Sequence, residues 1–305
     1  MSKPIILITG GSGLLALNWA AAVAETFDVV LLLHDRVVRP SFARTLFVDL
    51  SSPDGISRAL DEMEPLLVVH AAGLTNVEAC EKDPELATRT NVHIARDLAG
   101  ACAARGTKMV SISTDHLFDG STSFLDENAQ VSPLNVYGRT KADGEKAALD
   151  ANGSTVVVRT NFFCWGPRYR PSFSDMIIGN LRAGTEVSLF TDVFFTPILA
   201  QNLIDIVHRL VDRSAAGIFN IVGDERLSKF AFGKKVAAQF MLDDTLIRES
   251  QLSERTNLVQ RPLDMSLSNA KVRNLLGETL GNVDLYLQHM AALEGKAQIG
   301  ELQQL

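Results

Sequence analysis

Short apolar runs alternate with longer amphipathic stretches along the first half of the chain. Runs of β-branched and aliphatic residues predict strands at residues 4–9, 27–33, 45–48, 65–70, 108–112 and 155–159. Helical periodicity covers residues 14–26 and 84–105, and further helices begin near Ser52 and Tyr137. Strands this uniformly apolar are typical of a parallel sheet with both faces buried. The alternation predicts an α/β fold, a doubly wound parallel sheet with helices on both faces.

The second half of the chain follows a less regular pattern. The segment Gly166-Pro167-Arg168-Tyr169-Arg170-Pro171 interrupts the alternation. Beyond it we expect helices at residues 173–182, 197–213, 228–241, 268–276 and 282–294, and a strand at residues 217–222. The polar tail at residues 296–305 is expected to be disordered. The helices would form a small cap over one edge of the sheet.

The composition is that of an ordinary globular chain of 305 residues, 46% hydrophobic and 21% charged. A net charge of -7 argues against general binding to nucleic acid. Cys80, Cys102 and Cys164 lack the spacing of a metal site or a disulfide framework, so we expect no metal and a reducing compartment. No apolar run is long enough to span a membrane and no export signal is recognisable, which makes the cytoplasm the expected location.

A glycine-rich turn follows the first predicted strand directly. The spacing is Gly10-x-x-Gly13-x-x-Ala16. Gly10 can turn sharply, Gly13 lets the backbone approach a pyrophosphate, and the next helix offers free N–H groups to the anion. The plain alternative is a turn that the glycines only ease, but its place after a buried N-terminal strand favours a dinucleotide site. The same predicted site includes Ser12, Leu14 and Leu15.

The residues after the second predicted strand bear on the choice of dinucleotide. An acidic residue at this place usually accepts the ribose hydroxyls of NAD, whereas an arginine favours the 2′-phosphate of NADP. The chain has Asp35 and Arg36 side by side, with Arg39 beyond them. The choice between NAD(H) and NADP(H) stays open, with a lean to NADPH because two arginines could pair with a phosphate. Alternatively, these are loop charges in water.

Tyr137 and Lys141 stand four residues apart at the start of a helical pattern. One helical turn places both on the same face, where the lysine charge can lower the pKa of the phenol. Alone, such a pair is more often an ordinary solvated helix face. Thr114 follows the strand at residues 108–112, and in a parallel sheet it would meet the pair at the carboxyl edge. The three residues are our catalytic candidates, with the phenol as proton donor.

Taken together, these residues resemble the extended short-chain dehydrogenase/reductase family, most closely its dTDP-4-dehydrorhamnose reductase branch. The resemblance is carried by Thr9-Gly10-Gly11-Ser12-Gly13, residues 70–81, Asn91, Ser113-Thr114-Asp115-His116, the surroundings of Tyr137, and residues 158–162, 192–197 and 261–268. It implies a Rossmann-like sheet in a dinucleotide-binding domain of residues 1–160 plus about 186–222. A small, mostly helical substrate-binding subdomain would comprise about residues 161–185 plus 223–305.

The resemblance also implies a role for each matching residue. Tyr137 would protonate the carbonyl oxygen of the substrate, Lys141 would hold the nicotinamide ribose, and Thr114 would hydrogen-bond the same oxygen. Further cofactor contacts would come from Asp49, Leu50, Ala71, Ala72, Gly73 and Asn91, beside Asp35 and Arg36. The substrate side would comprise Thr75, Val77, Asp115, His116, Asn161, Phe162 and Arg261.

The implied activity is reduction, by NADPH or NADH, of a keto group on a nucleotide-activated deoxysugar. Three positions depart from the reductase pattern: Leu14 replaces a glutamine, His116 a tyrosine and Phe162 a tryptophan. The last two lie on the expected substrate side, so the identity of the sugar stays open. The alternatives are an epimerase or dehydratase of the same family and a non-catalytic NAD(P)-binding regulatory subunit. The oligomeric state also stays open, a homodimer included.

Overall fold

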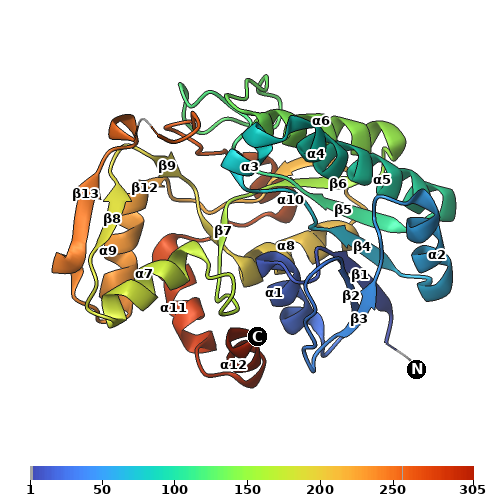
Figure 1. The fold of residues 1–305 in the computed structure, drawn as a ribbon, viewed down its shortest axis with the longest axis horizontal. Helices are drawn as coiled ribbons and strands as arrows, with labels where there is room; N and C mark the ends of the chain where they lie inside the picture. Colours follow the sequence, from blue (N-terminus) through green and yellow to red (C-terminus); the bar gives the residue numbers. More distant parts are fainter. Residues whose placement is uncertain (1–2, 256) are drawn as a thin grey trace.

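Seven parallel strands form the central sheet of the computed structural model, which describes residues 3–255 and 257–305 (Figure 1). Their spatial order is β11-β6-β5-β4-β1-β2-β3. The bounds are β1 Ile5–Thr9, β2 Asp28–Leu33, β3 Arg44–Phe47, β4 Leu67–His70, β5 Lys108–Ile112, β6 Val156–Arg159 and β11 Gly217–Asn220. The direction of winding reverses between β1 and β4, and such a reversal opens a crevice at the carboxyl ends of the strands.

Helices cover both faces of this sheet, as the apolar strands predict. Along β1, Ile6 and Ile8 point into one core with Trp19, whereas Leu7 points into a second core with Leu98. The first face carries α1 Leu14–Val23 and α8 Ala200–Asp212; the second carries α2 Pro53–Met63, α5 Ile94–Arg105 and α6 Val136–Ala151. The prediction of a doubly wound α/β fold is confirmed.

The chain between β4 and α5 is more broken than the predicted helix at residues 84–105. It forms α3 Val77–Lys82, α4 Pro84–Thr88 and a π-helical turn, Arg89–His93, before α5 begins. Two caps start the short helices: Asn76 accepts from the Ala79 N–H at 2.7 Å and Asp83 from the Leu86 N–H at 2.9 Å. These elements run along the carboxyl edge of the sheet and form one wall of the crevice.

The second half of the chain adds a smaller cap beside the sheet (Figure 1). Its helices are α7 Phe173–Arg182, α9 Lys229–Gln239 and α11 Val283–Leu293, with 3₁₀ turns at Asp244–Leu246 and Leu252–Glu254. Short strand pairs join them: β8 Val187–Phe190 with β13 Ile247–Ser250, β9 Phe194–Phe195 with β12 Leu227–Ser228, and β7 Phe162–Phe163 with β10 Ile198–Leu199. The helix α10 Ala270–Leu276 instead packs against β11 of the central sheet. The domain division stays a prediction, although β8, within residues 186–222, pairs in the cap through β13.

The C-terminal tail is ordered, so the prediction of a disordered segment at residues 296–305 is wrong. Residues 297–304 form α12 Ala297–Gln304, which packs against α1. Ile299 and Leu302 are buried, at 4% and 0% exposure. Glu301 also accepts hydrogen bonds from the backbone and hydroxyl of Ser41. Two apolar side chains one turn apart are enough to fix a short polar helix once a complementary surface exists.

Candidate active site

A cleft of about 1080 Å³ lies at the carboxyl edge of the sheet, between the sheet and the cap. It brings together most of the residues that the sequence singles out. The lining includes Gly10, Ser12, Gly13, Leu14, Leu15, Asp49, Leu50, Ala71, Ala72, Gly73, Thr75, Val77, Thr114, Asp115, His116, Tyr137, Lys141, Asn161, Phe162 and Arg261. Candidates from the glycine turn and from the catalytic group therefore share one cavity, as the predicted topology requires.

The glycine turn forms the floor of this cleft. Gly10 has a φ of 67°, and a Cβ there would lie 2.9 Å from the Cα of Ala72, so no side chain fits. The Gly13 N–H donates to the Gly10 carbonyl at 2.7 Å, and α1 begins at the next residue. No side chain caps α1. Its first N–H groups, at Leu14 and Leu15, are available to an anion in the cleft.

A buried hydroxyl that the sequence did not single out supports the neighbouring strand end. Thr9 Oγ1 accepts from the backbone N–H groups of Ala71 and Ala72 at 3.1 and 3.0 Å. Its own hydrogen is therefore directed to His70 Nδ1, 2.8 Å away. Burial lowers the pKa of His70 to about 3, so the ring is neutral with its proton on Nε2. This relay holds residues 71 and 72 beside the glycine turn.

Tyr137, Lys141 and Thr114 meet at the centre of the cleft. Asn135 caps α6 by accepting from the Gly138 N–H at 2.9 Å, which places Tyr137 in the first turn of the helix. Lys141 lies one turn later and donates to the carbonyl of Ile112, at the end of β5, at 2.8 Å. The helix start and the strand end thus hold the predicted pair against Thr114 without a ligand.

Burial sets the protonation of both groups. It raises the pKa of Tyr137 to about 12, although a hydrogen bond from the Thr114 side chain lowers it. It lowers the pKa of Lys141 to about 8, and only the carboxylate of Glu145 acts in the opposite direction. The effect of Lys141 on the pKa of Tyr137 stays a prediction. Desolvation is the largest influence on the pKa of the phenol in this structure, and the lysine is directed to Ile112. The phenol stays protonated at neutral pH.

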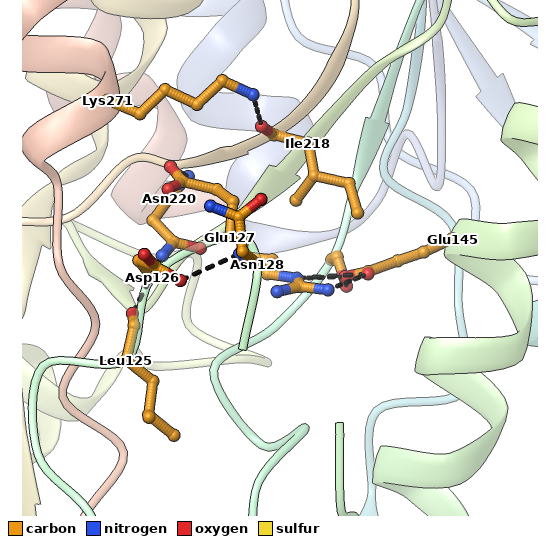
Figure 2. A network of polar contacts seen from close by, with 10 residues as sticks. Leu125, Asp126, Glu127, Asn128, Glu145, Ile218, Asn220 and Lys271 are labelled. Carbon is orange, nitrogen blue, oxygen red and sulfur yellow. Dashed lines mark hydrogen bonds and ion pairs between the residues drawn. The ribbon is translucent and has the colours of Figure 1, made fainter. Parts of the chain in front are cut away.

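A buried ion pair stands behind Lys141. Glu145, one turn along α6, receives two hydrogen bonds from Arg159 Nε, at 3.0 and 3.1 Å, and one from Nη2 at 2.7 Å. The side chains are 5% and 3% exposed. Ser113 donates a further hydrogen bond to Glu145. Figure 2 shows Glu145 projecting from its helix toward the sheet. The carboxylate thereby faces Lys141 while its own charge is compensated.

A second polar network, drawn in Figure 2, ties the loop after the catalytic strand to the sheet. Asn220, at the end of β11, donates through its side chain to the Leu125 carbonyl at 3.1 Å. Its backbone N–H donates to Glu127 at 2.8 Å, and Lys271 donates to the Ile218 carbonyl at 2.6 Å. The two bonds of Asn220 hold the long connection between Thr114 and α6, whereas the bond of Lys271 joins α10 to β11.

The end of the cleft that holds the predicted substrate residues is rich in charge. Asp115, 2% exposed, accepts from the Asn161 side chain, and His116 Nε2 lies 3.9 Å from its carboxylate. Burial lowers the pKa of His116, against the smaller effect of the Asp115 charge, and the ring Nδ1 has no hydrogen-bond partner among the described residues. Arg261 pairs with Glu78. Of these, Glu78 was not expected from the sequence, because its partner lies 183 positions away.

Lys229, at the start of α9, is a further charge that no sequence pattern marks. Its ammonium lies 3.3 Å from the centre of the Phe195 ring and 4.9 Å from that of Phe173. Burial lowers the pKa of Lys229 to about 8, and the carboxylate of Asp115 acts against this shift. The positive charge of Lys229 therefore lies near the end of the cleft that Asp115 lines.

Three predicted cofactor residues lie outside the cleft lining. Asn91 is buried behind the wall: its Oδ1 accepts from the Leu74 N–H at 2.8 Å and its Nδ2 donates to Thr140 Oγ1 at 3.0 Å. It joins the strand end after β4 to α6. Asp35 and Arg36 instead line an adjoining hollow of about 630 Å³ with Ser12. Their roles toward a cofactor stay predictions.

Within residues 3–255 and 257–305, no group of three or more His, Cys, Asp or Glu side chains is arranged to hold a metal ion. In the same ranges, no helix combines the length and the apolar character needed to cross a membrane.

The family model described as "RmlD substrate binding domain" matches residues 4–293, which is most of the chain. The chain belongs to this family. The RmlD-type proteins are part of the extended short-chain dehydrogenase/reductase family, so the resemblance seen in the sequence is confirmed. The match spans both the sheet and the cap.

Among relatives of known description, a protein of Haloferax volcanii, a "probable low-salt glycan biosynthesis reductase Agl14", is 32% identical over 88% of this chain and 91% of its own. A dTDP-4-dehydrorhamnose reductase of Sinorhizobium fredii is 26% identical over 95% of this chain and 99% of its own. The rat methionine adenosyltransferase 2 subunit beta is 26% identical over 88% and 82%. The RmlD family thus includes both reductases and a subunit named for another enzyme.

Solved structures agree with the fold. A dTDP-4-dehydrorhamnose reductase of Bacillus anthracis, determined with NADP, superposes with a TM-score of 0.83 at 22% identity and covers 95% of this chain and 99% of its own. A hypothetical dTDP-4-dehydrorhamnose reductase of Sulfolobus tokodaii superposes with a TM-score of 0.80 at 26% identity, and the match covers 93% of this chain and 98% of its own. At this identity the first comparison supports the architecture alone.

Proposed function

We propose that this chain is an NAD(P)H-dependent reductase of a keto group on a nucleotide-activated deoxysugar. One observation carries the proposal: a single cleft joins the glycine turn at Gly10 to Thr114, Tyr137 and Lys141. The chain fits a dinucleotide because the turn excludes a side chain at Gly10 and α1 offers uncapped N–H groups. The relatives named as reductases support the same activity.

In this proposal the bound nicotinamide supplies the hydride to the carbonyl carbon. Tyr137 donates its phenolic proton to the carbonyl oxygen, and its raised pKa keeps that proton in place until then. Thr114 orients the same oxygen by a hydrogen bond. Lys141, charged below pH 8, binds the nicotinamide ribose and compensates the phenolate that forms. Holding both reactants in one cleft supplies much of the rate.

We further propose that the cap holds the nucleotide sugar and the sheet holds the cofactor. Asp115, Asn161 and His116 would contact the sugar, and Arg261 its diphosphate. The lean toward NADPH is supported by Arg36, which lines the hollow beside Ser12. The free and buried Cys80, Cys102 and Cys164 support a cytoplasmic location. A homodimer stays a prediction.

A regulatory subunit is the second candidate, because one relative is named as the beta subunit of a methionine adenosyltransferase. In that case no nucleotide sugar would promote NADPH oxidation, and a partner enzyme would co-purify with the chain. An epimerase or dehydratase, the third reading, would hold NAD tightly through purification and would not consume it. NADPH oxidation, followed at 340 nm with a panel of dTDP- and UDP-keto sugars, therefore identifies the reductase. NAD retained through purification identifies the epimerase or dehydratase, and a co-purifying partner enzyme identifies the regulatory subunit.

The Tyr137→Phe variant tests the catalytic assignment. We expect it to bind NADPH as the wild type does and to lose about a hundredfold or more in kcat, since it lacks the proton to donate. Tyr286→Phe is the matched control: its hydroxyl donates to the Leu280 carbonyl at 2.7 Å, outside the cleft lining. Full activity of Tyr137→Phe on a substrate that the wild type reduces would disprove the role of Tyr137.

A further inference from the structure

The segment at residues 166–171, which interrupts the sequence pattern, is held firmly against the glycine turn. The hydroxyls of Ser172 and Ser174 both donate to the Cys164 carbonyl, at 2.5 and 3.1 Å. A Cβ at Gly166 would lie 2.6 Å from the Arg170 carbonyl oxygen and 2.7 Å from a methyl group of Leu14. The backbone at Gly166 therefore packs closely against Leu14, at the start of α1.

Tyr169 projects from this segment and makes two contacts with the cofactor-binding half. Its hydroxyl donates to the Ser12 carbonyl, inside the glycine turn, at 2.8 Å. The guanidinium of Arg36 lies over its ring, 4.1 Å from the centre. Arg36 comes from the loop after β2, so the tyrosine joins two separate parts of the predicted nucleotide site.

The hollow beside Tyr169 has the chemistry of a phosphate site. Ser12 and Arg36 line it, together with His34, Asp35 and Val37. Arginine binds phosphate through two parallel hydrogen bonds, in bidentate fashion. An exposed arginine loses side-chain conformational entropy when it binds, which weakens the binding. The ring of Tyr169 already restricts the guanidinium to one place. Asp35 is 89% exposed, with His34 Nδ1 3.0 Å from its carboxylate, and both project into solvent at the edge of the hollow.

We propose that Tyr169 is a positioning residue that holds Arg36 for the 2′-phosphate of NADPH, so that a residue of the cap side sets cofactor preference. This rests on the proposed function, since it requires the cleft to bind a dinucleotide. The contact has two separable parts. The ring positions Arg36, whereas the hydroxyl anchors the ring to Ser12. Arg39, the other arginine considered for this role, does not line the hollow.

Isothermal titration calorimetry with 2′,5′-ADP and 5′-ADP tests the proposal without any substrate. Tyr169→Leu should weaken 2′,5′-ADP about two- to fivefold, the change that corresponds to a cation–π contact of about 0.5–1 kcal/mol at an exposed site. The Kd of Tyr169→Leu for 5′-ADP should stay within about twofold of the wild-type value. Binding of 5′-ADP also shows that the variant is folded. Tyr169→Phe, which keeps the ring, should stay close to the wild type for both ligands. In an Arg36→Met background, Tyr169→Leu should have no further effect on 2′,5′-ADP.

The results separate the two proposals. If the wild type binds neither nucleotide, the proposed function fails and this inference fails with it. If the wild type binds 5′-ADP as tightly as 2′,5′-ADP, the cofactor site stands and the role of Arg36 is disproved. If Tyr169→Leu weakens the binding of both nucleotides equally, or of neither, Tyr169 is not a positioning residue for the 2′-phosphate. The same conclusion follows if Tyr169→Leu weakens the binding of 2′,5′-ADP as much in the Arg36→Met background as in the wild type.

Discussion

Replacing Arg159 by methionine should destabilise the protein strongly. The change leaves the Glu145 carboxylate buried, with Ser113 as its remaining donor among the hydrogen bonds of the wild type. Breaking a buried ion pair from one side typically costs about 3–5 kcal/mol, because the charge that is left stays out of water without its partner. We therefore expect the free energy of unfolding of Arg159→Met to fall by about 3–5 kcal/mol.

Urea unfolding at pH 7, followed by the fluorescence of the buried Trp19 and Trp165, measures this loss. The double variant Glu145→Gln/Arg159→Met is the control, because it leaves no buried carboxylate without its partner and should lose less stability than Arg159→Met alone. A loss below about 1 kcal/mol for Arg159→Met, or an equal or larger loss in the double variant, would refute the reasoning.

Two further predictions concern the cleft. The kcat/KM for the keto sugar should fall above pH 8, because Lys141 loses its charge near that pH. Glu145→Gln removes the charge that raises the pKa of Lys141, so this variant should show the fall in kcat/KM at lower pH. Lys229→Met, the control, should show the fall at the same pH as the wild type. If the fall disappears in Lys229→Met and is unmoved in Glu145→Gln, Lys229 is the group responsible. Gly10→Ala should weaken NADPH binding at least about tenfold, since its Cβ would displace the Ala72 backbone, while Gly100→Ala, with open space around it, should bind normally in the same calorimetric titration.

Local signals in the sequence are responsible for most of the fold prediction. The strands of the sheet are uniformly apolar, and their bounds match the prediction to within two residues. The glycine turn was recognisable because its chemistry depends on neighbours within seven residues. Tyr137 and Lys141 were recognisable because one helical turn relates them. The predicted helix at residues 84–105 failed in detail, since a π-helical turn has no distinct residue pattern.

The errors have a common physical origin in contacts between distant residues. The tail at residues 296–305 looks disordered by composition, but Leu302 finds a buried place against a surface that includes α1. β8 was missed because its partner, β13, follows some sixty positions later. The pKa of Tyr137 depends on how deeply the cleft buries the phenol, and no spacing in the sequence records that depth.

The sequence by itself determined which groups this protein brings to its cleft: the glycine turn, the Tyr137–Lys141 pair and Thr114. Each is specified by short-range periodicity or by the place of a residue at a strand end, which local physics decides. Only the tertiary structure decided how those groups are supported and charged. The Thr9–His70 relay, the Glu145–Arg159 pair and the contact of Tyr169 with Arg36 join residues 61, 14 and 133 positions apart. Their burial and mutual distances arise only when the chain has folded, because a hydrogen bond or a pKa shift depends on neighbours in space.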